Sequence, residues 1–146
     1  MIKGIHHIGV ATRDLDRLCA FYCDYFHGRR LAEFSWDQDN KALSERLGLA
    51  SSAGRLCMLG FAETRLEVFE FKEPVILPEN RRSVAAPGLS HIAFEVDDAL
   101  AEFERLSSVI NFHAPPLTMP AGGVFAYGRD PDGNVVEILQ TPKQIM

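Results

Sequence analysis

The sequence predicts an α+β protein made of two tandem βαβββ modules, and an internal repeat is the main observation behind this prediction. Residues 5–15 (IHHIGVATRDL) and 89–99 (LSHIAFEVDDA) align at an offset of 84 residues, which places His7 on His91 and Asp14 on Asp98. Each segment alternates apolar positions and then reaches an acidic helix cap, a pattern typical of a strand that runs into a helix.

Each half is expected to continue with a helix. The first helix is predicted over 14–27, with Gly28 as its left-handed C-terminal cap. Its inward face is formed by apolar residues at helical spacing, namely Leu15, Leu18, Tyr22, Tyr25 and Phe26. The second helix is predicted over 97–108, and its inward residues are Leu100, Phe103 and Leu106.

Three further strands complete each half. In the first half they are predicted at 29–36, 55–61 and 65–72, and in the second half at 109–113, 123–129 and 134–141. Residues 37–54 have no counterpart in the second half, and a short helix is expected there at 41–48. Asp130-Pro131-Asp132-Gly133-Asn134 predicts a hairpin turn, because Pro presets φ and Gly or Asn accepts positive φ.

The predicted organisation is a first module over 1–72, a linker over 73–88 and a second module over 89–146. The linker assignment rests on three prolines, Pro74, Pro78 and Pro87, and on the scarcity of periodic apolar residues. The two modules are expected to form one compact unit.

Composition excludes several classes of function. The chain has 146 residues, 47% of them hydrophobic and 24% charged, with a formal net charge of -5. Nucleic acid is excluded as a partner because phosphate neutralisation needs a basic face. No apolar run approaches the roughly 20 residues that span a bilayer, and the first residues lack a signal-peptide apolar region. A cytoplasmic protein without membrane contact is therefore expected.

Four residues at repeated positions predict a metal site. His7 and His91 occupy equivalent places on the first strand of each half, and Glu67 and Glu137 occupy equivalent places on the last strand. A carboxylate within an apolar strand is costly to bury without a partner. Two carboxylates matched by two histidines therefore indicate a shared cation, and imidazole with carboxylate suits Zn, Ni, Co, Mn or Fe(II).

Neighbouring polar residues have competing interpretations. Strand alternation predicts that His6 points to the face opposite His7. Glu70 is expected on the face opposite Glu67 and in solvent, while Glu63 is expected in an exposed turn.

These motifs resemble the vicinal-oxygen-chelate superfamily, which includes glyoxalase I, extradiol dioxygenases and bleomycin-resistance proteins. The resemblance rests on His7-Ile8-Gly9-Val10, Leu66-Glu67-Val68, the segment at 91–98 and the segment at 128–137. It implies a cupped mixed sheet, formed by the two modules, around one divalent metal bound by His7, Glu67, His91 and Glu137. It also implies a homodimer, and exposed sheet edges favour the same expectation.

The His/Glu/His/Glu set is similar to that of glyoxalase I. It implies an isomerase, epimerase or lyase acting on a small molecule with two neighbouring oxygens through a metal-stabilised enediolate. Glu67, Glu137 and Tyr127 are then the candidate catalytic residues. A ring-cleaving dioxygenase is the alternative, because Tyr127 lies ten residues before Glu137 as a tyrosine does in those enzymes. A third possibility is an antibiotic-resistance binding protein or transferase. Arg13, Arg55 and Arg129 are candidates for contacts with an anionic substrate such as glutathione.

Overall fold

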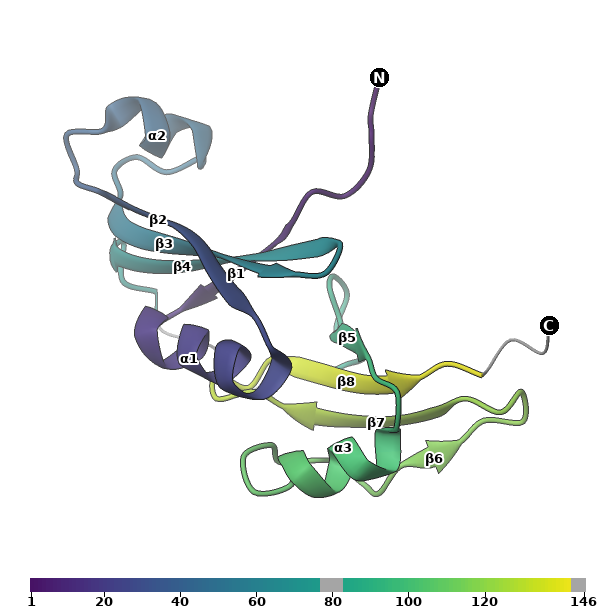
Figure 1. Ribbon diagram of the computed structural model, residues 1–146. Helices are drawn as coiled ribbons and strands as arrows, with labels where there is room; N and C mark the ends of the chain where they lie inside the picture. Colours follow the sequence, from purple (N-terminus) through teal and green to yellow (C-terminus); the bar gives the residue numbers. More distant parts are fainter. Residues whose placement is uncertain (77–82, 143–146) are drawn as a thin grey trace. The chain divides into compact units, whose positions relative to one another are not determined.

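The structure is a computed structural model that describes residues 1–76 and 83–142, and these residues form eight strands and three helices (Figure 1). The elements are, in chain order, β1 Ile8–Thr12, α1 Leu15–Phe26, β2 Arg29–Trp36, α2 Lys41–Arg46, β3 Ala53–Phe61, β4 Thr64–Glu73, β5 Ile92–Glu95, α3 Ala99–Leu106, β6 Leu117–Thr118, β7 Val124–Arg129 and β8 Val135–Gln140. This order confirms the predicted α+β class and the two tandem modules.

The described strands form two sheets of the same topology. The first has the order β1-β4-β3-β2 and the second the order β5-β8-β7-β6. In both sheets the first strand of the module runs parallel to the last strand, and the other pairs are antiparallel. The chain divides into two compact units, residues 1–77 and 78–146, and each unit holds one sheet. The predicted linker at 73–88 includes residues 77–82, which lie outside the described residues.

Helix α1 packs against the first sheet (Figure 1). It begins after Asp14, whose side chain accepts the N–H of Arg17. Its buried residues are Leu15, Leu18, Cys19, Phe21 and Tyr22, whereas the predicted core residues Tyr25 and Phe26 are only half-buried. The predicted cap at Gly28 is also wrong by one residue, because His27 holds the left-handed conformation with φ of 58°. Gly28 is needed instead for close packing, since a Cβ there would lie 3.0 Å from Phe61 and 3.1 Å from the Tyr22 carbonyl.

Helix α3 packs against β7 and β8 and begins after Asp98, whose carboxylate accepts the N–H groups of Leu100 and Ala101. Ala99 and Leu106 are its buried residues. Leu100, which the helical spacing predicted to point inward, is 58% exposed. The helix is shorter than predicted at both ends, and Ala99 takes the inward place in its first turn.

The strand predicted at 109–113 is not formed. The N–H groups of Val109 and Ile110 bond to the Leu106 carbonyl and continue the turn at the end of α3. Residues 111–113 nevertheless run beside β7, because His113 N–H bonds to the Tyr127 carbonyl and Arg129 N–H bonds to the Asn111 carbonyl. The edge strand is instead the unpredicted β6, which pairs with β7 beyond Pro115 and Pro116.

Two predicted local structures are confirmed. The short helix expected at 41–48 is α2, capped by Asn40. The turn at 130–134 is held by Asp130, whose carboxylate accepts the N–H groups of Asp132 and Asn134. Gly133 has φ of 87°, as the turn requires. None of the helices among the described residues is both long and apolar enough to cross a membrane.

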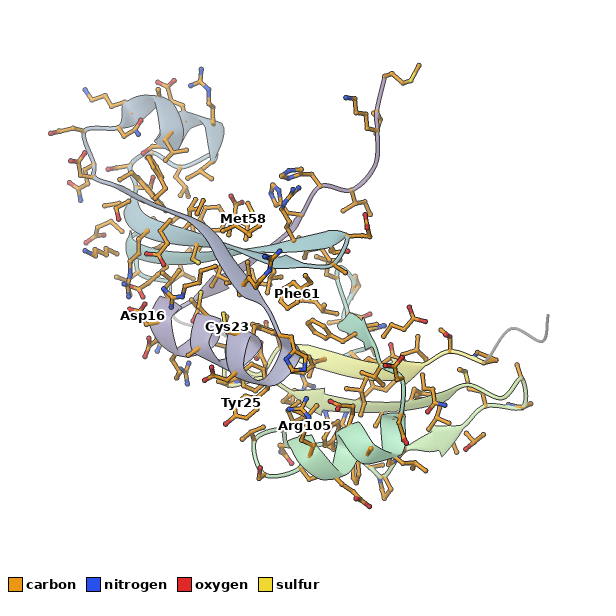
Figure 2. All side chains as sticks on the ribbon, viewed as in Figure 1. Asp16, Cys23, Tyr25, Met58, Phe61 and Arg105 are labelled. Carbon is orange, nitrogen blue, oxygen red and sulfur yellow. The ribbon has the colours of Figure 1, made fainter. Side chains whose placement is uncertain are left out.

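Glu70 is not in solvent, contrary to the prediction. It lies on the face of the first sheet opposite Glu67, where its carboxylate accepts the N–H of Leu15 at the start of α1, at 2.7 Å. Arg55, its cross-strand partner, donates two further hydrogen bonds to it. Asp16 of α1 (Figure 2) lies 2.8 Å from another nitrogen of the same guanidinium. Glu70 thus joins the helix to the sheet.

We expect Glu70→Gln to lower the free energy of unfolding near neutral pH by about 1–3 kcal/mol, since charge-assisted hydrogen bonds are lost. The hydrogen bond from Arg55 is the main cause that holds the pKa of Glu70 below its usual value of 4.5. A depressed folded-state pKa stabilises the protein above the unfolded value, and this contribution is lost as pH falls below 4.5.

Urea unfolding of wild type and Glu70→Gln at about pH 7 and about pH 3.5 measures this effect, and the difference between the two proteins should shrink at the lower pH. Glu63→Gln is the control, because Glu63 lies in an exposed turn as predicted. Equal differences at both pH values would contradict the assigned role of Glu70.

Candidate metal-binding half-sites

The first unit brings His7 and Glu67 together. His7 immediately precedes β1, and β1 pairs in parallel with β4 so that Gly9 lies opposite Glu67. His7 Nε2 is 3.2 Å from Glu67 Oε2. The Glu67 side chain is 17% exposed and the His7 side chain 37% exposed, so the pair has one open side.

The second unit repeats this geometry. His91 immediately precedes β5, and Ala93 lies opposite Glu137 on β8. His91 Nε2 is 3.2 Å from Glu137 Oε2. Glu137 is the more buried carboxylate, with a side chain only 10% exposed. The repeat at 84 residues therefore corresponds to two equivalent His–Glu pairs, although both histidines precede their strands rather than lie on them as predicted.

The residue before each histidine holds its ring. His6 Nδ1 is 2.9 Å from His7 Nδ1, and Ser90 Oγ is 2.8 Å from His91 Nδ1. These two partners are themselves related by the repeat offset. The prediction that His6 points away from His7 is wrong, because both residues precede β1 and strand alternation does not apply to them. In both units Nδ1 is engaged, and Nε2 is directed toward the carboxylate.

The donor set fits a divalent metal ion. Ligand atoms about 2.0–2.2 Å from a metal ion and at a right angle to one another lie roughly 3 Å apart, close to the separation within each pair. The Nδ1 contacts are the kind of outer-shell hydrogen bond that fixes the tautomer of a metal-bound histidine. Within residues 1–76 and 83–142, each pair stands as a separate half-site, and no three His, Cys, Asp or Glu side chains gather at one point.

Tyr127 distinguishes the second half-site from the first. It lies on β7 directly opposite Glu137, and its ring makes an edge contact with His91 at a centroid distance of 5.2 Å. Burial is the main cause that raises the pKa of Tyr127, and the Glu137 charge and a hydrogen bond with Glu137 add to it. Tyr127 is therefore a protonated donor at neutral pH. In the first unit the same place, opposite Glu67, is occupied by Met58 (Figure 2).

Apolar side chains extend from Glu67 across its face of the first sheet. The cross-strand register aligns Phe69, Leu56 and Phe34 in one row. The next row contains Phe71, Gly54 and Trp36. Trp36 makes edge contacts with Phe69 and Phe71, and the two phenylalanines stack at 5.6 Å. Phe34 is 49% exposed, so this face presents an apolar surface next to the first half-site.

The arginines considered for substrate contacts differ in their surroundings. Arg55 is bound by Asp16 and Glu70. Arg129 donates to the Gly133 carbonyl and to His113, whereas Arg13 lies on an exposed turn between β1 and α1. Arg129 is therefore the one of the three that directly contacts another polar side chain of the second half-site region.

The fold and the two His–Glu pairs define a two-module α+β protein with metal-ligand residues at repeated positions. Its sequence matches the family model of the Glyoxalase/Bleomycin resistance protein/Dioxygenase superfamily over residues 4–138. The match covers most of the chain, and the protein belongs to this superfamily. The resemblance inferred from the motifs is thereby confirmed.

Similar proteins are found in sequence and in structure. The uncharacterized protein YaeR of Escherichia coli strain K12 is 29% identical over 143 residues, which cover 95% of this chain and 97% of YaeR. A glyoxalase family protein from Bacillus cereus has a TM-score of 0.87 at 16% identity, covering 97% of this chain and 96% of its own. Lactoylglutathione lyase from Agrobacterium tumefaciens has a TM-score of 0.60 at 22% identity, covering 99% and 98%. These two structural likenesses establish the fold alone.

Proposed function

We propose that the protein is a metal-dependent isomerase, epimerase or lyase, with one divalent metal ion held by His7, Glu67, His91 and Glu137. The observation that carries the proposal is the repeated His–Glu pair, with the same 3.2 Å separation in both units. Both pairs are partly open and have an engaged Nδ1, as metal-binding histidines require. The substrate class is a small molecule with two neighbouring oxygens.

When bound, the metal ion supplies Lewis-acid stabilisation of negative charge on the substrate oxygens. Glu67 then acts as the base. Its carboxylate takes the proton from the carbon next to the carbonyl, and the electrons of that C–H bond form a carbon–carbon double bond as the carbonyl oxygen becomes an oxyanion. Returning the proton to the neighbouring carbon completes an isomerisation.

Tyr127 is assigned to the same site as a hydrogen-bond donor. Its raised pKa keeps the hydroxyl protonated, so it can donate to a substrate oxygen while negative charge develops there. Glu137 remains a ligand in this scheme, because it is the more buried carboxylate and faces both His91 and Tyr127.

The experiment that tests this function measures exchange of substrate C–H with deuterated solvent. The protein is loaded in turn with Zn, Ni, Co, Mn and Fe(II) and offered thiohemiacetals, 2-oxo acids and catechols. Exchange with a thiohemiacetal or a 2-oxo acid is the expected result. Oxygen consumption with a catechol, without any exchange, would replace the proposal by ring-cleaving dioxygenation.

The dioxygenase remains a second candidate because of Tyr127. The hydroxyl lies beside the carboxylate of Glu137 and the ring of His91, where it could hold a catechol oxygen. Two histidines and one carboxylate suffice for that chemistry. Glu67 argues against it, because a fourth protein ligand occupies a position that oxygen and catechol would need.

We also propose that the protein is a homodimer. Strand β2 is an eight-residue edge of the first sheet and carries half-exposed Leu31 and Phe34. Long apolar edge strands are normally paired or covered in stable proteins. Sedimentation at micromolar concentration is expected to give twice the 16.3 kDa chain mass. A single species of 16.3 kDa across the concentration range would refute the dimer.

A further inference from the structure

A pocket of about 330 Å³ opens beside the second half-site. It is lined by His91 and Tyr127 of that half-site together with Ser90, Val84 and His113. Its volume suits a small ligand. Because His91 and His113 line the same pocket, one ligand bound there contacts both the metal-ligand side and His113. His113 has no counterpart in the repeat, and the catalytic scheme above does not use it.

Two hydrogen bonds from β7 fix His113 at this place. Its backbone N–H bonds to the Tyr127 carbonyl at 2.8 Å. Its ring accepts a hydrogen bond at Nε2 from Arg129 Nε, at 3.2 Å. Arg129 is in turn held by a hydrogen bond from its Nη1 to the Gly133 carbonyl in the turn that follows β7. The histidine ring is thus attached to the same strand that carries Tyr127.

The bond from Arg129 also determines the proton on the ring. A guanidinium in a protein is always protonated and can only donate, so Nε2 of His113 must be the acceptor. A histidine whose Nε2 accepts is neutral and carries its proton on Nδ1. His113 therefore offers the pocket an N–H donor, with the positive charge of Arg129 directly behind it.

We propose that His113 and Arg129 form a subsite for a carboxylate of the substrate, next to the oxygens that chelate the metal ion. The substrate class is then a 2-hydroxy or 2-oxo acid that carries a second carboxylate. His113 donates from Nδ1 to this carboxylate, and Arg129 is a positioning residue that fixes the tautomer. The inference deepens the proposed function and rests on it for the chelated part of the ligand.

The first test uses metal-free protein, so its outcome does not depend on metal binding. Ring nitrogen shifts in ¹H–¹⁵N spectra distinguish the two histidine tautomers, and the His113 signals are assigned by their loss in His113→Phe. At a pH above the usual histidine pKa of about 6.5, wild type should show His113 with its proton on Nδ1. Arg129→Met should shift it toward the Nε2–H form. A wild-type Nε2–H tautomer would overturn the proposal.

The second test compares two ligands on zinc-loaded protein by calorimetry. Tartronate and L-lactate both present a hydroxyl and a carboxylate as neighbouring oxygens, but only tartronate has a second carboxylate. Wild type should bind tartronate about tenfold more tightly, the equivalent of about 1.4 kcal/mol. His113→Phe should remove this preference and leave lactate affinity within about threefold, since the chelated atoms are unchanged.

Equal affinity of wild type for the two ligands, or no binding of either one to protein whose zinc content has been verified, would overturn the subsite. A preference that persists in His113→Phe would overturn it as well. Failure of the protein to take up zinc is a different result, because it refutes the proposed metal site while the tautomer measurement still decides the role of Arg129.

Discussion

Glu67→Gln is expected to yield a folded, metal-bound protein whose substrate C–H exchange is slower by about 10²–10⁴-fold, the contribution of a positioned base. Glutamine keeps the size of the side chain and an oxygen ligand, but it removes the basic carboxylate. Glu67 lies on β4 with its side chain 17% exposed, so the substitution adds no bulk to the sheet. The measurement is deuterium exchange into substrate, with wild type and variant loaded with the same metal.

Glu63→Gln serves as the matched control, since it makes the same chemical change in the exposed turn before β4. It should exchange at the wild-type rate. If Glu67→Gln exchanges as fast as this control, Glu67 is not the base. A slower rate accompanied by loss of metal would assign Glu67 to binding alone.

Removing either histidine is expected to weaken metal binding strongly and to a similar extent in the two units. Even outer-shell partners of metal ligands contribute about 10–100-fold to affinity, so His7→Ala and His91→Ala should each lose at least about 100-fold. Competition with a chelator measures this change. Ser90→Ala, which removes only the hydroxyl bound to His91 Nδ1, should lie between wild type and His91→Ala.

Similar losses in both histidine variants would indicate that the two pairs hold one shared ion. A metal affinity that is unchanged in His7→Ala and lost in His91→Ala would restrict binding to the second unit. That outcome would remove His7 and Glu67 from the site.

The repeat explains why so much of this architecture was predictable from sequence. An offset of 84 residues gave equivalent places to His7 and His91, and the parallel pairing of the first and last strands then aligns each histidine with its glutamate. The same offset relates His6 to Ser90 and could have identified both as Nδ1 partners. Strand alternation misplaced His6 because β1 begins only at Ile8.

Other features depended on tertiary contacts that local patterns do not contain. Glu70 looked like a solvent-facing strand residue, but the start of α1 supplies a backbone N–H that it accepts. Leu100 had the right helical spacing, yet Ala99 and Leu106 form the inward face of α3. His113 carried no sequence signal at all, because its position follows from a turn after α3 and two hydrogen bonds with β7.

The most direct test of the shared metal site is elemental analysis of purified wild type beside Glu67→Ala and Glu137→Ala, with Glu63→Ala as the control. The account predicts close to one divalent metal ion per chain in wild type and in the control, and a large loss in both ligand variants. Full metal content in both Glu67→Ala and Glu137→Ala would contradict it.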